Sequence, residues 1–424
     1  MRVLITGGYG LIGTACLERL RRDGHDLVGA GRSIGQAQRR FPYARWVAAD
    51  FHELTTPASW HALLAGIDAV VNCVGALQDG ARDDLDRIHI VAPAAMFAAC
   101  ETLGVRRVVH ISAIGANGEG PTRFARTKGS TEQDLAGRNL DWVILRPGLV
   151  LASGVYGGTA MLRGVAGIPF VTPVVAATSL VHIVAIEDVA ETVAWALRAG
   201  APARLRLDLV HPQPLTIAGI VAGYRRWLGL RPQRTLALPQ WYAIAMARFA
   251  DALAWLGWRS PLRSTALAQL ADGIIGDPAR WVVATGIAPQ SFEEILSLHP
   301  ATVQDRWFSQ LYLLKPLAIG VLALFWIATG IIALGPGWNE AVAVMRGTGA
   351  GAGLAGAAVV AGAVLDMMLG VGVLLRRASR AALLGMLAVS FAYLAAAAVF
   401  APQLFVDPLG RVLKIFPIIL ANLF

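Results

Sequence analysis

The sequence predicts a doubly wound α/β domain on a parallel sheet with a small substrate-side region, then an all-α transmembrane bundle of about four helices. Short β-rich runs alternate with helical stretches through residues 1–150, which is the pattern of βαβ units. Residues 311–424 contain only ten of the 37 basic and 28 acidic residues. Hydrophobic residues make up 56% of the chain and charged residues 15%, against about 45–50% and about 25% in soluble domains.

The α/β region begins with strands whose apolar runs are short and β-branched. Helical patterns fill the intervals between them, as expected for parallel strands joined by crossover helices. The expected strands are Val3–Thr6, Asp26–Ala30, Trp46–Ala49, Ala69–Val74, Arg107–Ser112 and Asp141–Leu145, and the clearest helices are Leu11–Arg22, Val91–Leu103 and Ile186–Ala199.

A glycine-rich motif, Thr6–Gly13, follows the first strand and opens the first helix. Gly7 permits the tight turn, Gly10 lets the backbone approach a pyrophosphate, and Gly13 lets the helix pack closely on the strand. The free N–H groups and positive dipole end of the helix would then face the phosphates. The motif therefore predicts a bound dinucleotide.

The end of the second strand bears on the choice between the two nicotinamide dinucleotides. Proteins that bind NAD(H) place an acidic residue there, which binds the ribose 2′-hydroxyl. This chain has no carboxylate between Gly29 and Ser33, and Arg32 is suited to a 2′-phosphate. We therefore expect NADP(H) to be favoured over NAD(H), although a solvated arginine is the simpler alternative in so arginine-rich a chain.

The segment Gln240–Arg259 is rich in aromatic residues at helical spacing. Such a helix suits a membrane interface, where tryptophan and tyrosine rings are favoured. Packing on the core of the substrate-side region is an equally open alternative, because periodicity does not separate the two. The aromatic residues are Trp241, Tyr242, Phe249, Trp255 and Trp258.

Three long apolar segments follow: Pro316–Asn339, Gly347–Leu375 and Ala381–Val406. Each exceeds the roughly 20 residues that a spanning helix needs. Only Asp366 is charged within them. A fourth segment, Leu404–Phe424, is weaker because it carries three charged residues.

The orientation in the membrane follows from the charged turns. The apolar run at Met1–Thr6 is too short for a signal peptide. We therefore expect a multi-pass protein of the inner (cytoplasmic) membrane, with its nucleotide domain in the cytoplasm. The turn with Arg376, Arg377 and Arg380 then lies on the cytoplasmic side, as the positive-inside rule requires. The loop Trp338–Arg346 is expected outside.

Other classes of protein are disfavoured. Three scattered cysteines, Cys16, Cys73 and Cys100, have no metal-binding spacing and suggest neither a disulfide framework nor a zinc site. The net charge of +9 comes almost entirely from arginine, without the basic runs and interleaved aromatics of nucleic-acid binders. We expect no metal and no nucleic acid, and a lipid bilayer as the partner of the basic surface.

Several segments together resemble the short-chain dehydrogenase/reductase superfamily, in its extended and atypical branches. The likeness covers about residues 1–300. The segments are the glycine motif Thr6–Gly13, Asp50-Phe51, the strand Val71–Gly75, Val109–Ser112 with its terminal serine, Leu145–Gly148 with its Arg-Pro-Gly element, and Val181–Ala190 with its His and Asp-Val-Ala.

The resemblance implies an NAD(P)-binding Rossmann domain over residues 1–150 and the substrate-side region of the extended fold over 151–310. The fold is akin to that of NAD-dependent epimerases and dehydratases. The cofactor-binding residues that the resemblance implies are Thr6, Gly7, Tyr9, Gly10, Leu11, Ile12, Gly13, Arg32, Ser33, Asp50, Phe51, Val74, Gly75, Ser112, Lys128 and Pro147.

Within this superfamily the chain looks most like the branch that contains the NADPH-binding accessory subunit of respiratory complex I. Residues 311–424 resemble the four-helix DoxX-like membrane domain. That second resemblance depends on hydropathy and on Asp366 more than on a sharp motif.

The catalytic residues of the superfamily are only partly present. Its enzymes use Ser, Tyr and Lys, with Tyr and Lys one helical turn apart so that the lysine charge lowers the phenol pKa. Ser112 and Lys128 match, but Phe124 occupies the tyrosine position, and a phenyl ring exchanges no proton. Tyr156 or Tyr9 could substitute, though ordinary packing is the simpler role for each.

Three functions remain open on this basis. One is a membrane-bound oxidoreductase acting on a hydrophobic, quinone-like or isoprenoid substrate, and another is a non-catalytic NADPH-binding assembly or sensor protein. A transport role depends only on Asp366, since carboxylates in spanning helices are costly and usually face the bundle interior. An ion pair of Asp366 with Lys414 or Arg411 is the structural alternative.

Overall fold

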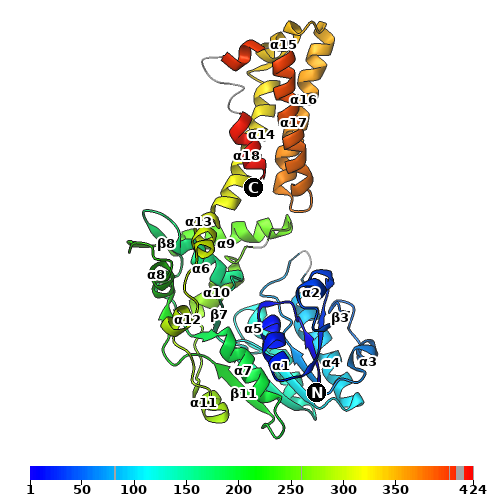
Figure 1. The fold of residues 1–424 in the computed structure, drawn as a ribbon, viewed down its shortest axis with the longest axis vertical. Helices are drawn as coiled ribbons and strands as arrows, with labels where there is room; N and C mark the ends of the chain where they lie inside the picture. Colours follow the sequence, from blue (N-terminus) through cyan, green and yellow to red (C-terminus); the bar gives the residue numbers. More distant parts are fainter. Residues whose placement is uncertain (81–82, 259, 401, 407–414, 424) are drawn as a thin grey trace. The chain divides into compact units, whose positions relative to one another are not determined.

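The computed structural model describes residues 1–80, 83–258, 260–400, 402–406 and 415–423. The chain forms two compact units (Figure 1). The first unit comprises Met1–Asp251 and Ser260–Ser309, and the second comprises Ala252–Arg259 and Gln310–Phe424. The second unit therefore includes a short segment that lies within the first unit's span of sequence.

A seven-stranded sheet with the order β11-β6-β5-β4-β1-β2-β3 forms the centre of the first unit. All of its neighbouring strands pair in parallel. The chain order reverses between β1 and β4, and α/β sheets bind ligands at the carboxyl ends of strands at such a point. The strands are β1 (Arg2–Thr6), β2 (Asp26–Gly31), β3 (Arg45–Ala48), β4 (Ala69–Asn72), β5 (Arg107–Ile111), β6 (Asp141–Pro147) and β11 (Leu205–Leu209).

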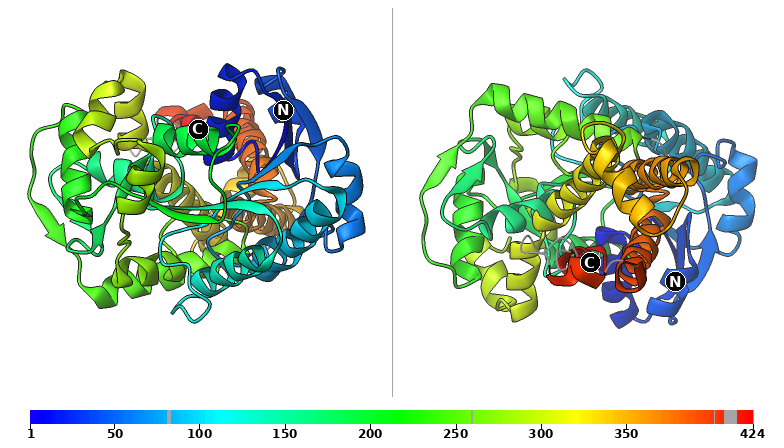
Figure 2. Two further views of the ribbon diagram at one scale, coloured as in Figure 1. Left: turned by 90° about the horizontal axis from the view of Figure 1, so that it is seen from below. Right: turned by 90° about the horizontal axis from the view of Figure 1, so that it is seen from above.

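Helices cover both faces of this sheet (Figures 1 and 2). Successive side chains of β1 point to opposite faces. Val3 and Ile5 join one core with α1 and α7, while Leu4 joins the other with α3, α4 and α5. These helices are α1 (Leu11–Arg22), α3 (Pro57–Leu64), α4 (Ala92–Leu103), α5 (Arg123–Gly137) and α7 (Ile186–Ala196); the short α2 (Gly35–Arg40) and the π-helix η1 (Arg87–Val91) complete the region.

The substrate-side region contains three two-stranded sheets, which pair β10 with β7, β12 with β9 and β13 with β8. Tyr224 and Phe292 centre its separate core, with their rings edge to face at 5.5 Å. Its elements are β7 (Leu149–Leu151), α6 (Gly157–Ala166), β8 (Thr172–Val174), β9 (Leu180–Val181), β10 (Ile183–Ala185), β12 (Leu215–Thr216), α8 (Ile217–Trp227), β13 (Thr235–Ala237), α10 (Ser264–Asp272), α11 (Ala279–Thr285), α12 (Phe292–Leu298) and α13 (Val303–Leu311).

Helix α9 (Gln240–Trp255) turns its small residues inward and its aromatic residues outward. Trp241, Phe249 and Trp255 are 70%, 66% and 80% exposed. The residues of α9 that are buried are alanines: Ala243, Ala247, Ala250 and Ala254. These aromatic rings do not pack on the core, which leaves the lipid-facing alternative as the prediction for this helix.

The second unit is helical. Three segments of the described chain are long and apolar enough to cross a membrane: Val303–Leu334, which begins in the first unit, Ala352–Leu374 and Ser379–Phe400. Helices α14, α16 and α17 run alongside one another (Figure 1). The backbones of α14 and α16 approach closely, since a Cβ on Gly330 would lie 2.6 Å from the carbonyl oxygen of Ala363. The helices are α14 (Leu314–Leu334), α15 (Trp338–Gly347), α16 (Ala352–Leu374), α17 (Ser379–Phe400), the 3₁₀ helix η2 (Pro402–Val406) and α18 (Ile415–Leu423).

Two expectations for this unit need amendment. The loop expected over Trp338–Arg346 is the helix α15, because Trp338, Val342 and Met345 recur at helical spacing and form a half-buried face towards α16. Of the expected fourth segment, Leu404–Phe424, residues 407–414 lie outside the described part of the chain, and the helix that follows them has nine residues.

The segment Ala252–Arg259 contacts the loop after α16 within the second unit. The indole Nε1 of Trp258 donates to the carbonyl oxygen of Leu374 at 2.6 Å. The backbone N–H of Arg376 donates to the carbonyl oxygen of Leu256 at 3.1 Å, and the Arg376 guanidinium lies 5.2 Å from the centre of the Trp258 ring. These contacts explain why the segment belongs to the helical unit.

Candidate functional site

The glycine loop between β1 and α1 has the shape that a dinucleotide requires. Gly7 adopts φ 66°, which is unfavourable for other residues, and a Cβ on Gly13 would lie 2.3 Å from the Gly7 carbonyl oxygen. Gly10 precedes the helix without a side-chain cap. The first-turn N–H groups of Leu11 and Ile12 and the positive helix end therefore face the crevice, which fits a pyrophosphate.

An aromatic side chain covers the carboxyl end of β2. The ring of Tyr9 lies against Gly31, where a Cβ would come within 2.3 Å of its Cε1 atom. The same ring stacks on Trp46, with ring centres 6.4 Å apart. Arg32 and Ser33 follow at once and are exposed. Tyr9, Arg32 and Ser33, three of the expected cofactor-binding residues, are thus gathered at one strand end.

The guanidinium of Arg32 is paired with a carboxylate from a distant loop. Its Nη2 donates to Asp83 Oδ1 at 2.9 Å, and although burial opposes the charged form, Asp83 raises the Arg32 pKa above its usual value. The backbone N–H and Nδ1 of His52 each lie 3.0 Å from Asp50 Oδ1. Although burial opposes them, these contacts lower the pKa of the Asp50 carboxyl.

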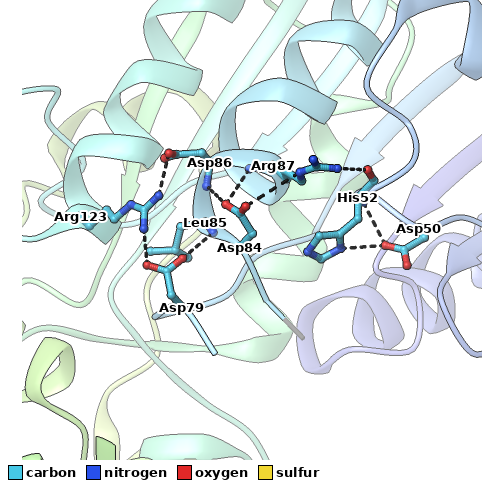
Figure 3. A network of polar contacts seen from close by, with 8 residues as sticks. All are labelled: Asp50, His52, Asp79, Asp84, Leu85, Asp86, Arg87 and Arg123. Carbon is cyan, nitrogen blue, oxygen red and sulfur yellow. Dashed lines mark hydrogen bonds and ion pairs between the residues drawn. The ribbon is translucent and has the colours of Figure 1, made fainter. Parts of the chain in front are cut away.

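A polar network links this corner to the first turn of α5 (Figure 3). Arg87 Nη1 donates to the carbonyl oxygen of His52 at 2.8 Å. Arg123, the first residue of α5, donates to Asp79 at 2.6 Å and to Asp86 at 2.7 Å. The acidic loop after β4 is therefore bound to the helix that carries Phe124 and Lys128.

Asn72 ties together the ends of three neighbouring strands. Its Oδ1 accepts from Thr6 Oγ1 at 2.7 Å and from the Val74 backbone N–H at 3.2 Å. Its Nδ2 lies 3.1 Å from Nδ1 of His110. Because all three groups are buried or half-buried, these contacts hold the carboxyl ends of β1, β4 and β5 together.

Two residues implied by the resemblance have buried side chains. The ring of Phe51 is buried edge to face on Trp60, with centres 5.4 Å apart. Pro147 is buried at the end of β6. The glycine after it is required by packing, since a Cβ on Gly148 would lie 2.4 Å from the carbonyl oxygen of His182.

Lys128 lies on the buried side of α5, directly beneath the strand end of β4. Its Nζ donates to the carbonyl oxygen of Ile111 at 2.9 Å, and a Cβ on Gly75 would lie 3.4 Å from it. No side chain at position 75 therefore covers the ammonium group. Burial lowers the pKa of Lys128 to about 8, against the opposing effect of the Glu132 charge.

Ser112 is bound to a buried carboxylate that the sequence analysis missed. Its Oγ donates to Glu132 Oε1 at 2.5 Å. Arg146 binds the same carboxylate through two atoms: its Nε lies 2.9 Å from Oε1 and its Nη2 lies 2.5 Å from Oε2. Nε of Arg206 lies 3.5 Å from Oε2. Since the hydroxyl proton of Ser112 points to Glu132, it is not offered to a substrate carbonyl.

Phe124 packs beside a histidine that the sequence analysis also missed. The rings of Phe124 and His89 meet edge to face, with centres 5.7 Å apart. Nε2 of His89 accepts from the Ala76 backbone N–H at 3.1 Å, so its proton is on Nδ1, 2.8 Å from Thr127 Oγ1. Burial and the charge of Lys128 lower the His89 pKa to about 2, so the ring is neutral near pH 7 and is no substitute acid.

The two tyrosines considered as substitutes lie elsewhere in the fold. Tyr9 lies at the end of β2, and Tyr156 precedes α6 with 62% of its surface exposed. Within the part of the chain that the structure describes, neither hydroxyl bonds to Ser112 or Lys128. The phenol that carbonyl chemistry needs is therefore not supplied by these two residues in this geometry.

Asp366 has hydroxyl partners within the helical unit. Tyr393 Oη lies 3.3 Å from its Oδ1, and Thr329 Oγ1 lies 3.5 Å from its Oδ2. The carboxyl group thus joins three helices at a position 8% exposed. The cations considered as ion-pair partners, Lys414 and Arg411, lie outside the described residues.

Comparisons with known proteins agree with this architecture. Residues 7–195 match an NAD(P)H-binding family, and residues 323–423 match the DoxX-like family. An NAD(P)H azoreductase of Xenophilus azovorans is 26% identical over 35% of this chain and 48% of its own length. An uncharacterised protein of Mycobacterium tuberculosis is 30% identical over 37% of this chain, which spans only 16% of that protein.

Solved structures show the same fold at low identity. A UDP-glucuronic acid 4-epimerase from Bacillus cereus in complex with NAD has a TM-score of 0.54 and 17% identity, covering 74% of this chain and all of its own. The enzyme WbmG from Bordetella bronchiseptica, in complex with NAD and UDP, has a TM-score of 0.54 and 16% identity, covering 73% and 96%.

The chain therefore joins an NAD(P)H-binding domain of the Rossmann type, like that of the short-chain dehydrogenase/reductases, to a DoxX-like domain with three apolar helices. The match to an NAD(P)H-binding family supports a nicotinamide dinucleotide as the cofactor, and the DoxX-like match with three apolar helices indicates a membrane protein. The narrower likeness to the complex I accessory subunit stays a prediction.

Proposed function

We propose that this protein is a membrane-anchored oxidoreductase that favours NADP(H) over NAD(H) and reduces a hydrophobic or quinone-like acceptor. One observation carries the proposal: Lys128 is in place at a complete glycine-loop site, whereas the phenol position is Phe124. A carbonyl substrate needs a positioned acid, which is worth about 10²–10⁴-fold in rate. A quinone-like acceptor needs none, because its reduced oxygens take protons from water.

The residues divide the work between binding and orientation. When bound, the dinucleotide supplies a hydride, and one proton from water completes the two-electron reduction of the acceptor. The loop Gly7–Gly13 binds the pyrophosphate, Arg32 the 2′-phosphate, and Lys128 the nicotinamide ribose. Glu132 holds Ser112 and Arg146 in a fixed arrangement at the end of β5 and β6. The NAD(P)H azoreductase relative supports the oxidoreductase class.

The test is turnover by the full chain purified in detergent. Bound nucleotide is first identified, and NADPH oxidation is then followed against a panel of quinones, azo dyes, aldehydes and diketones. We expect quinone-like acceptors to be reduced. Lys128→Ala should weaken NADPH binding about tenfold, because it removes a charge-assisted hydrogen bond, and Tyr156→Phe should change NADPH binding little. Reduction of aldehydes alone would refute the acceptor class.

A non-catalytic NADPH-binding role is the second candidate. Two observations favour it: Phe124 replaces the acid, and the hydroxyl of Ser112 donates to Glu132. Nucleotide binding without turnover on any acceptor would support this role. Phe124→Tyr would then leave NADPH affinity little changed. Weak carbonyl reduction is expected only when Ser112 is also released from Glu132.

The placement in the cell is proposed on the same physical grounds. The NAD(P)-binding domain over residues 1–150, the substrate-side region over 151–310 and the DoxX-like region over 311–424 would belong to an inner-membrane protein. Arg376 and Arg377 lie between α16 and α17, and Arg380 lies in the first turn of α17. Basic residues at such a turn favour the cytoplasmic side. The nucleotide domain would then be cytoplasmic.

A further inference from the structure

The pairing of Arg32 with Asp83 has a bearing on which dinucleotide the protein selects. Arg32 follows β2, where a 2′-phosphate would be read. Asp83 comes from the acidic loop after β4, 51 residues further along the chain. Its Oδ1 is 2.9 Å from Nη2 of Arg32, and the two side chains are 37% and 15% exposed respectively. The guanidinium is thus partly neutralised by the protein itself.

A second carboxylate adds to this effect. Asp50 lies close enough for its charge to act on Arg32. Among the residues that the structure describes, Arg32 therefore has two carboxylates acting on it at the end of β2. A ligand with a charged 2′-phosphate must compete with Asp83 for the guanidinium and also accept repulsion from both carboxylates. A ligand with a 2′-hydroxyl does neither, because the hydroxyl carries no charge.

We propose that Asp83 is a specificity-determining residue. It competes with the 2′-phosphate of NADP(H) for Arg32 and so reduces the degree to which the protein prefers NADP(H) over NAD(H). This inference rests on the proposed binding of both dinucleotides at the glycine loop. Asp83 acts on selectivity rather than on binding as such, since the pyrophosphate and ribose contacts lie elsewhere, at Gly7–Gly13 and at Lys128.

The test is a comparison of NADPH and NADH dissociation constants for the full chain in detergent, by titration calorimetry. Asp83→Asn removes one charge while keeping the side-chain size. We expect NADPH to bind about three- to tenfold more tightly and NADH to change less than about twofold, as expected for loss of one ion pair and one repulsion. Asp84→Asn is the matched control, because it removes the same charge from the neighbouring residue, whose carboxylate lies 4.0 Å from Nε of Arg87.

A double-mutant cycle separates competition from simple repulsion. In an Arg32→Ala background the NADPH gain from Asp83→Asn should shrink to less than about half, because no guanidinium remains to be released. The inference is overturned if the gain is undiminished there, if Asp84→Asn gives the same gain, or if both dinucleotides gain equally. Retained NADH binding reports that Asp83→Asn is folded.

The outcome also distinguishes this inference from the proposed function. If the wild type binds neither dinucleotide, the proposed function itself fails. If it binds both and Asp83→Asn leaves their ratio unchanged, the site stands and the role of Asp83 is refuted.

Discussion

Glu132 is a heavily bonded acid of the candidate site, although it is not among the residues expected to bind the cofactor. It is 2% exposed and binds Ser112 and Arg146 together. Its partner Arg146 is 26% exposed, so removal of the carboxylate leaves a partly solvated guanidinium unpaired, at a cost of about 3 kcal/mol, the low end for a buried ion pair. We therefore expect Glu132→Ala to lower the unfolding free energy of the nucleotide unit by about that amount, measured by urea denaturation in detergent.

The control for Glu132 lies on the same helix. Asp134 pairs with Arg138 at 2.9 Å, but both side chains are partly exposed. Asp134→Ala should cost no more than about 1 kcal/mol, because exposed ion pairs contribute little. Equal losses in the two variants would show that Glu132 is not the buried anchor described above.

Lys128 should make nucleotide binding depend on pH. Its pKa is lowered by burial to about 8 from an ordinary value of 10.5. The ammonium form binds the ribose hydroxyls, so NADPH affinity should be constant below about pH 7 and fall as the pH rises through about 8. Calorimetric titration at several pH values measures this, and Lys128→Met should flatten the profile in that range.

The same pKa has the opposite consequence for stability. Between pH 8 and 10.5 the unfolded chain binds the Lys128 proton more firmly than the folded chain does. The contribution of Lys128 to stability therefore increases with pH across this window and is lost as the pH falls through it.

For the binding prediction, a pH profile of NADPH affinity that stays unchanged in Lys128→Met would exclude Lys128 as the group responsible.

The site could be predicted from the sequence only where a local pattern carried it. The glycine loop and Lys128 stand in such patterns. Glu132 left one signal, since it follows Lys128 by four residues and so shares its helix face. Asp83 left none, because its partner is 51 residues away in sequence and their contact depends on the path of a loop.

At the level of the element, the exposed aromatic surface of α9 predicts contact with lipid. Phe249→Cys, labelled with an environment-sensitive fluorophore in a variant without the native cysteines, should emit at shorter wavelength in lipid nanodiscs and be quenched by brominated lipid. Val283→Cys on α11 is the control, since Val283 is also highly exposed, at 86%, but stands outside the aromatic surface. Similar emission at both positions would argue against lipid contact.

The elements were predicted best where one periodicity dominated. All six expected strands and the helix Leu11–Arg22 are confirmed to within a few residues. Strand β11 was missed although the alternation of Leu205–Leu209 is itself a strand pattern, because the run has only five residues and lies in the less regular part of the sequence after residue 150. Helix α15 was taken for a loop since glycines at both ends and two charges obscured its apolar face.

For the whole molecule, orientation in the membrane is the main prediction. Ser379→Cys, at the first residue of α17, should be labelled by impermeant thiol reagents only after the cytoplasmic face is opened. Asn339→Cys on α15 should be labelled in intact cells, because a single spanning helix separates it from the nucleotide unit. The reverse pattern would overturn a cytoplasmic nucleotide domain.

The contact of Trp258 with Leu374 has a consequence for how the chain is made. Its two partners are 116 residues apart, which is roughly ten seconds of translation at about 5–20 residues per second. Throughout that interval Ala252–Arg259 has been synthesised, but the residues around Leu374 that it contacts have not yet been translated. Nascent chains halted before residue 374 should therefore keep this tryptophan-bearing stretch accessible to proteases, and chains halted after residue 400 should protect it.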